Sequence, residues 1–149
     1  MSPLWSIPYF NVDMFKIDWL HACDLGITCD FLGSLFTYIA DRMPGRSHKL
    51  RCKELHVKMK AWYKDNPTHS KLDQLTPTML KKEKAKFPKL RAKAGEARAL
   101  VPFAEYVCKE VLGNSVEDRA VTATAATLMC LCYLFVYVYH VCTNSKYSI

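Results

Sequence analysis

The 149-residue sequence lacks the short motifs by which several enzyme classes are recognised. It has no glycine-rich phosphate loop, no dinucleotide-binding fingerprint and no nucleophile elbow. Its seven cysteines form no regular, closely paired framework, which argues against a small disulfide-stapled secreted domain and favours reduced thiols. The first 15 residues lack a basic start followed by an apolar run, so no secretory signal is predicted. We therefore expect an intracellular protein, nuclear or cytoplasmic.

The apolar content is high enough for a real core. Half of the residues are hydrophobic and 12% are aromatic, which suits one globular domain of this length. Apolar residues follow helical spacing over most of the chain, whereas residues 14–20 alternate between apolar and polar side chains. The predicted fold is therefore mainly α, with four to six helices and one short strand near residues 14–20.

Capping residues and prolines indicate the limits of the first two helices. Thr28 or Asp30 can cap a helix that ends at Pro44-Gly45. Ser47 can cap the next helix, which stops at Asn66-Pro67. Both segments carry an apolar stripe at spacings of three and four, as expected for helices that cover a core.

Similar signals mark the second half of the chain. Thr76-Pro77 predicts the start of a short helix around residues 79–86. A longer helix is predicted over residues 91–112, with a kink or break at Pro102. Ser115 and Asp118 resemble a capping arrangement for the last helix. The expected core comprises Trp19, Leu20, Phe31, Leu35, Leu55, Met59, Trp62, Leu100, Phe103 and Val107.

Positive charge is concentrated in the middle third of the sequence. Residues 46–98 hold 16 Lys and Arg against 5 Asp and Glu, whereas the segments before and after are slightly acidic. Such a region attracts the phosphate backbone of DNA or RNA or anionic lipid headgroups, although a solvated lysine-rich surface is the simpler alternative. The residues predicted to bind nucleic acid are Lys49, Arg51, Lys53, Lys58, Lys60, Lys81, Lys82, Lys84, Lys86, Lys89 and Arg91.

The C-terminal part of the sequence has two interpretations. Residues 120–142 contain no Asp, Glu, Lys or Arg, and as a helix they would reach about 34 Å, enough to cross a hydrocarbon core of about 30 Å. The same residues carry a stripe that suits a buried terminal helix. We divide the chain into a helical domain at 1–112, with the basic region at 46–98, and an apolar terminal helix with an unstructured end at 113–149.

One segment gathers residues that can bind metal or move protons. Asp18, His21 and Asp24 lie three positions apart, so they would be neighbours on a helix. The pair Asp18 and Asp24 could hold Mg²⁺ for phosphoryl transfer, or the two could be ordinary turn and loop residues. A zinc site is a weaker alternative. Its candidate ligands are His21, Cys23, Cys29, Cys52 and His56.

The same segment carries a resemblance to a known family. Residues 17–27, Ile-Asp-Trp-Leu-His-Ala-Cys-Asp-Leu-Gly-Ile, with Phe31-Leu32-Gly33 after them, resemble the D-x-[ML]-H-x-x-x-[LD]-G-[VI] segment of CACTA-like transposases. Residues 62–67 and 89–92 are similar to segments of algal protist reading frames that share this string. The resemblance implies a piece of an RNase H-like transposase, with Asp18 and His21 at the matching motif positions.

Three functions follow as expectations. An RNase H-like enzyme needs more strands and more acidic residues than this chain offers, so we expect a non-catalytic, transposon-derived fragment that binds DNA or RNA without sequence preference. A membrane protein anchored through residues 120–142 is the first alternative. A metal-dependent DNA nuclease or strand transferase that uses Asp18 and Asp24 is the second.

Overall fold

The computed structural model describes residues 20–80 and 87–144. Within these ranges the chain is helical and has no strand, which confirms the mainly α class, and no sheet of an RNase H-like remnant is present there. The strand expected near residues 14–20 lies outside the described residues except for Leu20, where a π-helix begins. The elements are the π-helix η3 (Leu20–Thr28), α1 (Cys29–Arg42), α2 (His48–Asp65), α3 (Pro77–Leu80), α4 (Ala94–Val111) and α5 (Val116–Asn144).

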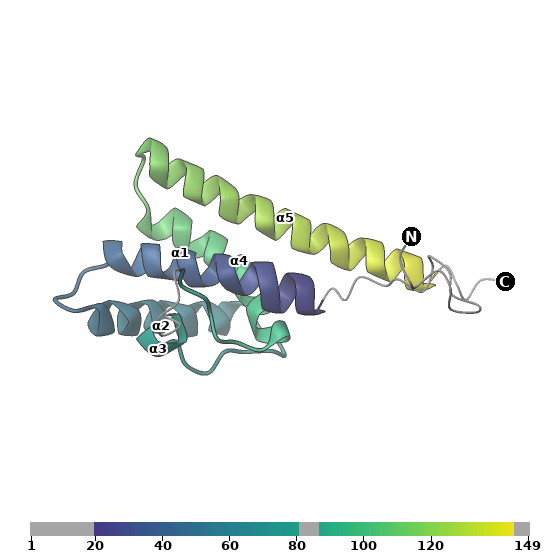
Figure 1. The fold of residues 1–149 in the computed structure, drawn as a ribbon, viewed down its shortest axis with the longest axis horizontal. Helices are drawn as coiled ribbons and strands as arrows, with labels where there is room; N and C mark the ends of the chain where they lie inside the picture. The colour runs from purple at the N-terminus through teal and green to yellow at the C-terminus, as the bar shows by residue number, and fades with distance from the viewer. Residues whose placement is uncertain (1–19, 81–86, 145–149) are drawn as a thin grey trace, which may run out of the picture.

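The helices are arranged around α1 and α4. Figure 1 shows α5 on one side of α1, with α2 and the short α3 on the opposite side. Helix α4 packs against η3, α1 and α5 and also contacts α2, so it connects the two sides of the bundle. The far end of α5 projects beyond the other helices (Figure 1).

Two of the predicted helix caps are present. The Ser47 hydroxyl accepts a hydrogen bond from the Leu50 N–H at 3.3 Å and opens α2. The Ser115 hydroxyl accepts one from the Asp118 N–H at 3.1 Å and opens α5. The cap expected at Thr28 or Asp30 is wrong, because Thr28 has helical backbone angles and makes no side-chain cap hydrogen bond, and Asp30 already lies in the first turn of α1. Since η3 runs directly into α1, the helix start is at Leu20 and no cap is needed at Thr28.

Helix α4 also differs from the prediction. It begins at Ala94 and not near residue 91, with the Lys93 N–H donating to the Glu96 carboxylate at 2.8 Å. Pro102 lies inside this helix, which continues to Val111, so of the expected kink or break the break is wrong. Proline removes only one backbone donor, and the core packing of Phe103 and Val107 holds the next turns in place.

The core lies between α1, α2 and α4. The predicted core residues Phe31 and Trp62 are only partly buried and pack against its edge, and Trp19 and the Leu20 side chain lie outside what the structure describes. The aromatic rings of Phe36 and Phe103 meet with centroids 5.8 Å apart, and Trp62 contacts Phe103 at the same distance. The predicted core residues that are buried are Leu35, Leu55, Met59, Leu100, Phe103 and Val107.

A close backbone approach joins α1 to the segment between α3 and α4. The Leu90 N–H donates to the Cys29 carbonyl at 2.9 Å. A Cβ atom on Gly33 would lie 2.5 Å from the Leu90 nitrogen and from the Lys89 Cα. These distances are shorter than any normal contact, and both atoms belong to backbone that cannot rotate away. Only glycine therefore fits at this turn of α1.

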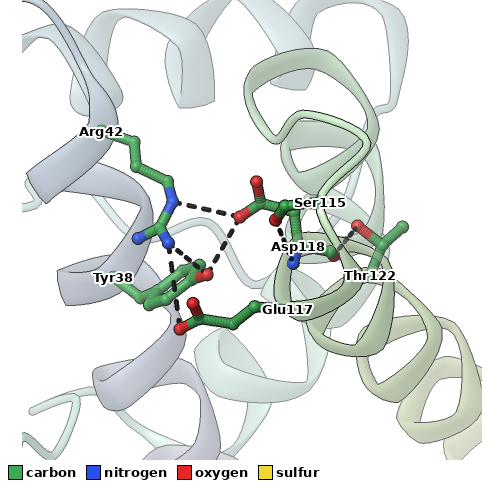
Figure 2. A network of polar contacts seen from close by, with 6 residues as sticks. All are labelled: Tyr38, Arg42, Ser115, Glu117, Asp118 and Thr122. Carbon is green, nitrogen blue, oxygen red and sulfur yellow. Dashed lines mark hydrogen bonds and ion pairs between the residues drawn. The ribbon is translucent and has the colours of Figure 1, made fainter.

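A polar network ties the start of α5 to the end of α1 (Figure 2). The Tyr38 hydroxyl donates to the Asp118 carboxylate at 2.9 Å, and the Arg42 Nε lies 3.1 Å from the same oxygen. The Arg42 guanidinium also covers the Tyr38 ring, 3.4 Å from its centroid. Desolvation and the hydrogen bond to Asp118 raise the pKa of Tyr38 to about 12. Tyr38 therefore stays a hydrogen-bond donor at neutral pH.

The described part of α5 packs on the bundle. Ala125 is buried and Val121 packs against the core, whereas Leu131 and Leu134 are exposed. The hydroxyls of Thr124 and Thr127 donate back to carbonyls one turn earlier, at 2.8 and 2.9 Å. Within the described residues, no helix combines the length and apolar character needed to cross a bilayer.

The first prediction concerns Gly33. Alanine is the better helix former by about 1 kcal/mol, yet we expect Gly33→Ala to lower the free energy of unfolding by about 1–3 kcal/mol, because the methyl group meets backbone. Gly95→Ala is the matched control, since its Cβ would meet the rotatable Ser70 hydroxyl at 2.8 Å. Urea unfolding of both variants measures the difference. An equal loss in the two, or a gain at Gly33, would contradict the proposed close approach.

Candidate functional site

Helix α2 sorts its basic residues onto different faces. At 3.6 residues per turn, positions 49, 53, 56, 60 and 64 fall on one side of the helix. Cys52, Leu55, Met59 and Tyr63 point into the core. The first face therefore presents four lysines and one histidine away from the bundle interior.

The chain after α2 returns along this face and builds a wall beside it. The Leu72 N–H donates to the Tyr63 hydroxyl at 3.3 Å, and the Leu75 N–H donates to the His56 Nδ1 at 3.2 Å. The side chains of Leu72 and Leu75 are both buried in the core. Two hydrogen bonds and two apolar anchors thus hold residues 71–77 against α2.

The space between α2 and this wall is a groove of about 890 Å³. Its apolar lining comes from Leu50, Leu72, Leu75 and Pro77, together with Tyr63. Five lysines line the groove, and no ion pair joins any of them to another described residue. One carboxylate, that of Asp73, also lines the groove. The lysines that line it are Lys49, Lys53, Lys60, Lys64 and Lys71. We call this feature the lysine groove.

His56 lies in the lysine groove as a neutral acceptor. Its Nδ1 accepts the Leu75 N–H, so the ring carries its proton on Nε2. Burial lowers the pKa of His56, and the positive charge of Lys60 lowers it further. The imidazole is therefore uncharged at neutral pH and holds the wall in place.

The predicted basic residues separate into two groups. Lys49, Lys53 and Lys60 lie together in the lysine groove. The Arg51 Nη2 lies 3.3 Å from the Asp41 carboxylate, and Lys58 pairs with Glu110 on α4. These two side chains lie on other faces of α2, and their charges are compensated within the protein.

The remaining basic candidates are not part of the lysine groove as described. The Lys89 Nζ pairs with the Asp30 carboxylate at 3.1 Å, and Arg91 is exposed beyond α3, its N–H bonded to the Met79 carbonyl at 2.9 Å. Lys81, Lys82, Lys84 and Lys86 lie outside the described residues.

Sequence reasoning did not assign Lys64, Lys71 or His56 to a nucleic-acid surface. The helical spacing of Lys64 with Lys53 and Lys60 is the signal that could have found it.

Asp24 is held by an arginine from another helix. Its carboxylate is buried in η3, and both oxygens accept hydrogen bonds from Arg98 of α4. Asp18, the other predicted metal ligand, lies outside the described residues, and His21 is exposed. The carboxylate of Asp24 therefore has a structural partner in this fold.

The zinc candidates do not converge where the structure describes them. Cys29 and Cys52 are buried in the core, and the Cys52 sulfur lies 3.4 Å from the His48 Nε2. Burial raises the pKa of the Cys29 thiol, which disfavours the thiolate that zinc requires. Across residues 20–80 and 87–144, no group of three His, Cys, Asp or Glu side chains is placed to hold a metal ion.

The second prediction tests the Asp24–Arg98 pair. Arg98→Met leaves a buried carboxylate without a partner, so we expect a loss of unfolding free energy somewhat below the roughly 3–5 kcal/mol typical of fully buried pairs, because Arg98 is partly exposed. Asp24→Asn in the Arg98→Met background should recover part of the loss. Thermal unfolding of the single and double variants measures the coupling, and strictly additive losses would contradict it.

The third prediction concerns the pH dependence of stability. The pKa of His56 is lower in the folded protein than the value of about 6.5 expected for the unfolded chain. At a pH between these two values the unfolded chain therefore binds more protons than the folded protein. We expect the contribution of His56 to the free energy of unfolding to be complete above about pH 6.5 and to be lost as the pH falls through the lower pKa of the folded state. The difference in unfolding free energy between wild type and His56→Gln should shrink on acidification. A constant difference across this range would contradict the neutral-acceptor role.

Comparison with known proteins identifies no relative of this chain. The chain matches no family model, no curated protein and no solved structure. The similarity of residues 17–27 to CACTA-like transposases therefore stays a prediction.

Proposed function

We propose that the chain is a non-catalytic nucleic-acid-binding protein that holds a phosphate backbone in the lysine groove. The observation that carries the proposal is the convergence of five lysines from α2 and residues 71–77, none of them paired with a described acidic residue. Lysines whose charge is not compensated within the protein are free to pair with phosphates and to release the counterions bound to them. The paired Arg51, Lys58 and Lys89 are not part of this surface.

The shape of the lysine groove argues for contact with the backbone and not with the bases. Base stacking on a protein needs an exposed aromatic face. Tyr63 is the aromatic residue that lines the groove, and its ring is buried against the core with its hydroxyl bonded to Leu72. Lysine contacts to phosphate carry no sequence information. The proposed binding is therefore independent of base sequence.

The resemblance to CACTA-like transposases fits this proposal. A piece of a transposase that keeps a basic surface but lacks further strands and acidic residues would retain affinity for DNA without cleaving it. The cysteines Cys23, Cys29, Cys52, Cys108, Cys130 and Cys132 are free thiols. Free thiols are consistent with the nuclear or cytoplasmic compartment that we propose.

The fourth prediction tests the lysine groove by removing charge. Lys53→Gln with Lys60→Gln should weaken binding to a short DNA duplex and make the slope of log K against log salt less negative by about 2, because each phosphate contact contributes about 0.9. Fluorescence anisotropy of a labelled duplex across a salt series measures both quantities.

The matched control removes the same charge elsewhere. Lys109→Gln with Arg119→Gln changes exposed residues of α4 and α5 that do not line the lysine groove. We expect this control to keep the wild-type salt slope. Equal effects in the two double variants would mean that only net charge matters. Wild-type binding to phosphatidylserine vesicles without binding to DNA or RNA would replace the proposal with a lipid-surface function.

A further inference from the structure

We propose that His56 strengthens nucleic-acid binding in the lysine groove as the solution becomes more acidic, by joining the Leu75 N–H as a second donor to one phosphate. This inference rests on the proposed function and adds its regulation. It is carried by the position of one hydrogen bond inside the groove, between His56 of α2 and residue 75 of the wall.

In the neutral state neither the His56 Nδ1 nor the Leu75 N–H can donate to a ligand. The Leu75 N–H donates to the His56 Nδ1 at 3.2 Å, so the two groups satisfy each other. An approaching phosphate meets lysines along the rim but finds this backbone N–H already occupied. Binding at neutral pH therefore gains nothing from the His56 Nδ1 or from the Leu75 N–H.

Protonation reverses the role of Nδ1. The added proton makes Nδ1 a donor, and it then faces the Leu75 N–H, which is also a donor. Two donors cannot bond to each other, so an acceptor must enter between them. A phosphate oxygen is such an acceptor, and charge-assisted bonds from an imidazolium and a backbone N–H are the kind that hold anions in proteins. The bond lost on protonation becomes two bonds to the ligand.

The wall does not depend on this hydrogen bond alone. The Leu72 N–H remains bonded to the Tyr63 hydroxyl, and the side chains of Leu72 and Leu75 remain buried. The Met79 N–H donates to the Thr76 carbonyl at 3.0 Å and opens α3 beyond the wall. Residues 71–77 are thus anchored on both sides of the point where protonation acts, so the separation of the two nitrogens that admits the phosphate oxygen stays local.

The charges around His56 favour a bound phosphate as the partner of the imidazolium. On α2 the groove carries Lys49, Lys53, Lys60 and Lys64, and on the wall it carries Lys71 and the carboxylate of Asp73. The described part of α3, Pro77–Leu80, has no charged residue. In the free protein, burial and then the positive charge of Lys60 lower the pKa of His56 and so oppose its protonation. A bound phosphate offsets that repulsion.

Proton binding and phosphate binding must therefore reinforce each other. If phosphate raises the affinity of His56 for a proton, protonation raises the affinity for phosphate by the same factor. One charge-assisted contact of this kind corresponds to about a tenfold gain in affinity. We expect the association constant for a short DNA duplex to increase about three- to tenfold between about pH 8 and about pH 5.5, at constant salt.

The experiment compares this pH ratio among three proteins. Anisotropy titrations of a labelled duplex at the two pH values are made with wild type, His56→Gln and His69→Gln. His69 lies outside the lysine groove, in the loop after α2, and is the matched control. We expect wild type and His69→Gln to show the same increase on acidification and His56→Gln to show none. A second measurement needs no variant, since NMR titration of the His56 ring should show a higher pKa with the duplex bound than without it.

The outcomes separate the two proposals. If wild type does not bind the duplex at both pH values, the proposed function is overturned and, with it, the role of His56. Binding with the same pH ratio in wild type and His56→Gln overturns only the role of His56 and leaves the lysine groove as the binding surface. An unchanged His56 pKa in the presence of duplex overturns the role of His56 in the same way. A higher pKa together with a pH ratio lost only in His56→Gln supports it.

Discussion

The close packing of residues 89–90 on α1 at Gly33 is the constraint on which the rest of the arrangement depends. It lets the Leu90 N–H reach the Cys29 carbonyl at the start of α1. The next residue, Arg91, donates to the Met79 carbonyl at 2.9 Å, which fixes α3 on the same segment. Because this segment leads directly into α4, its position on α1 also sets where α4 begins and which of its faces meets the core. A side chain at position 33 would push the backbone of residues 89–90 away from α1.

The lysine groove is a product of the same arrangement. Its wall lies between α2 and α3, and α3 is held by the segment that packs on Gly33. The wall packs along α2 on the side that carries the lysines without described ion-pair partners, whereas the paired Arg51 and Lys58 lie on other faces of the helix. Helix α5 is attached at the opposite side through the Tyr38, Arg42 and Asp118 network. The groove and this network therefore lie on different parts of the bundle, and charge changes in the groove do not touch the attachment of α5.

Much of the fold could be predicted from local signals. The spacing of apolar residues indicated the helices, and the hydroxyls of Ser47 and Ser115 marked two helix starts correctly, because a cap involves only the next three residues. Thr28 was misassigned because a π-helix that precedes α1 leaves no local signal. The Asp24–Arg98 pair joins residues 74 positions apart, and the bond between Leu75 and His56 depends on how the chain turns after α2. The lysines of α2 could have been sorted by helical spacing, but the addition of Lys71 from the wall could not.

The hydrogen bond from the Ser34 hydroxyl to the Pro88 carbonyl joins residues 54 positions apart, and the backbone hydrogen bond from Leu90 to Cys29 closes a loop of similar length. These long loops have a consequence for the order of folding. Helices α1 and α2 are adjacent in sequence, so they can form and pair early, with little loop-closure entropy. The return of residues 88–90 to α1 closes a long loop and must come later. During synthesis, the apolar face of α2 and its lysines would be present before α4 arrives to cover the core. A nascent chain that stops short of residue 94 would carry the charges of the groove without the packing that orders them.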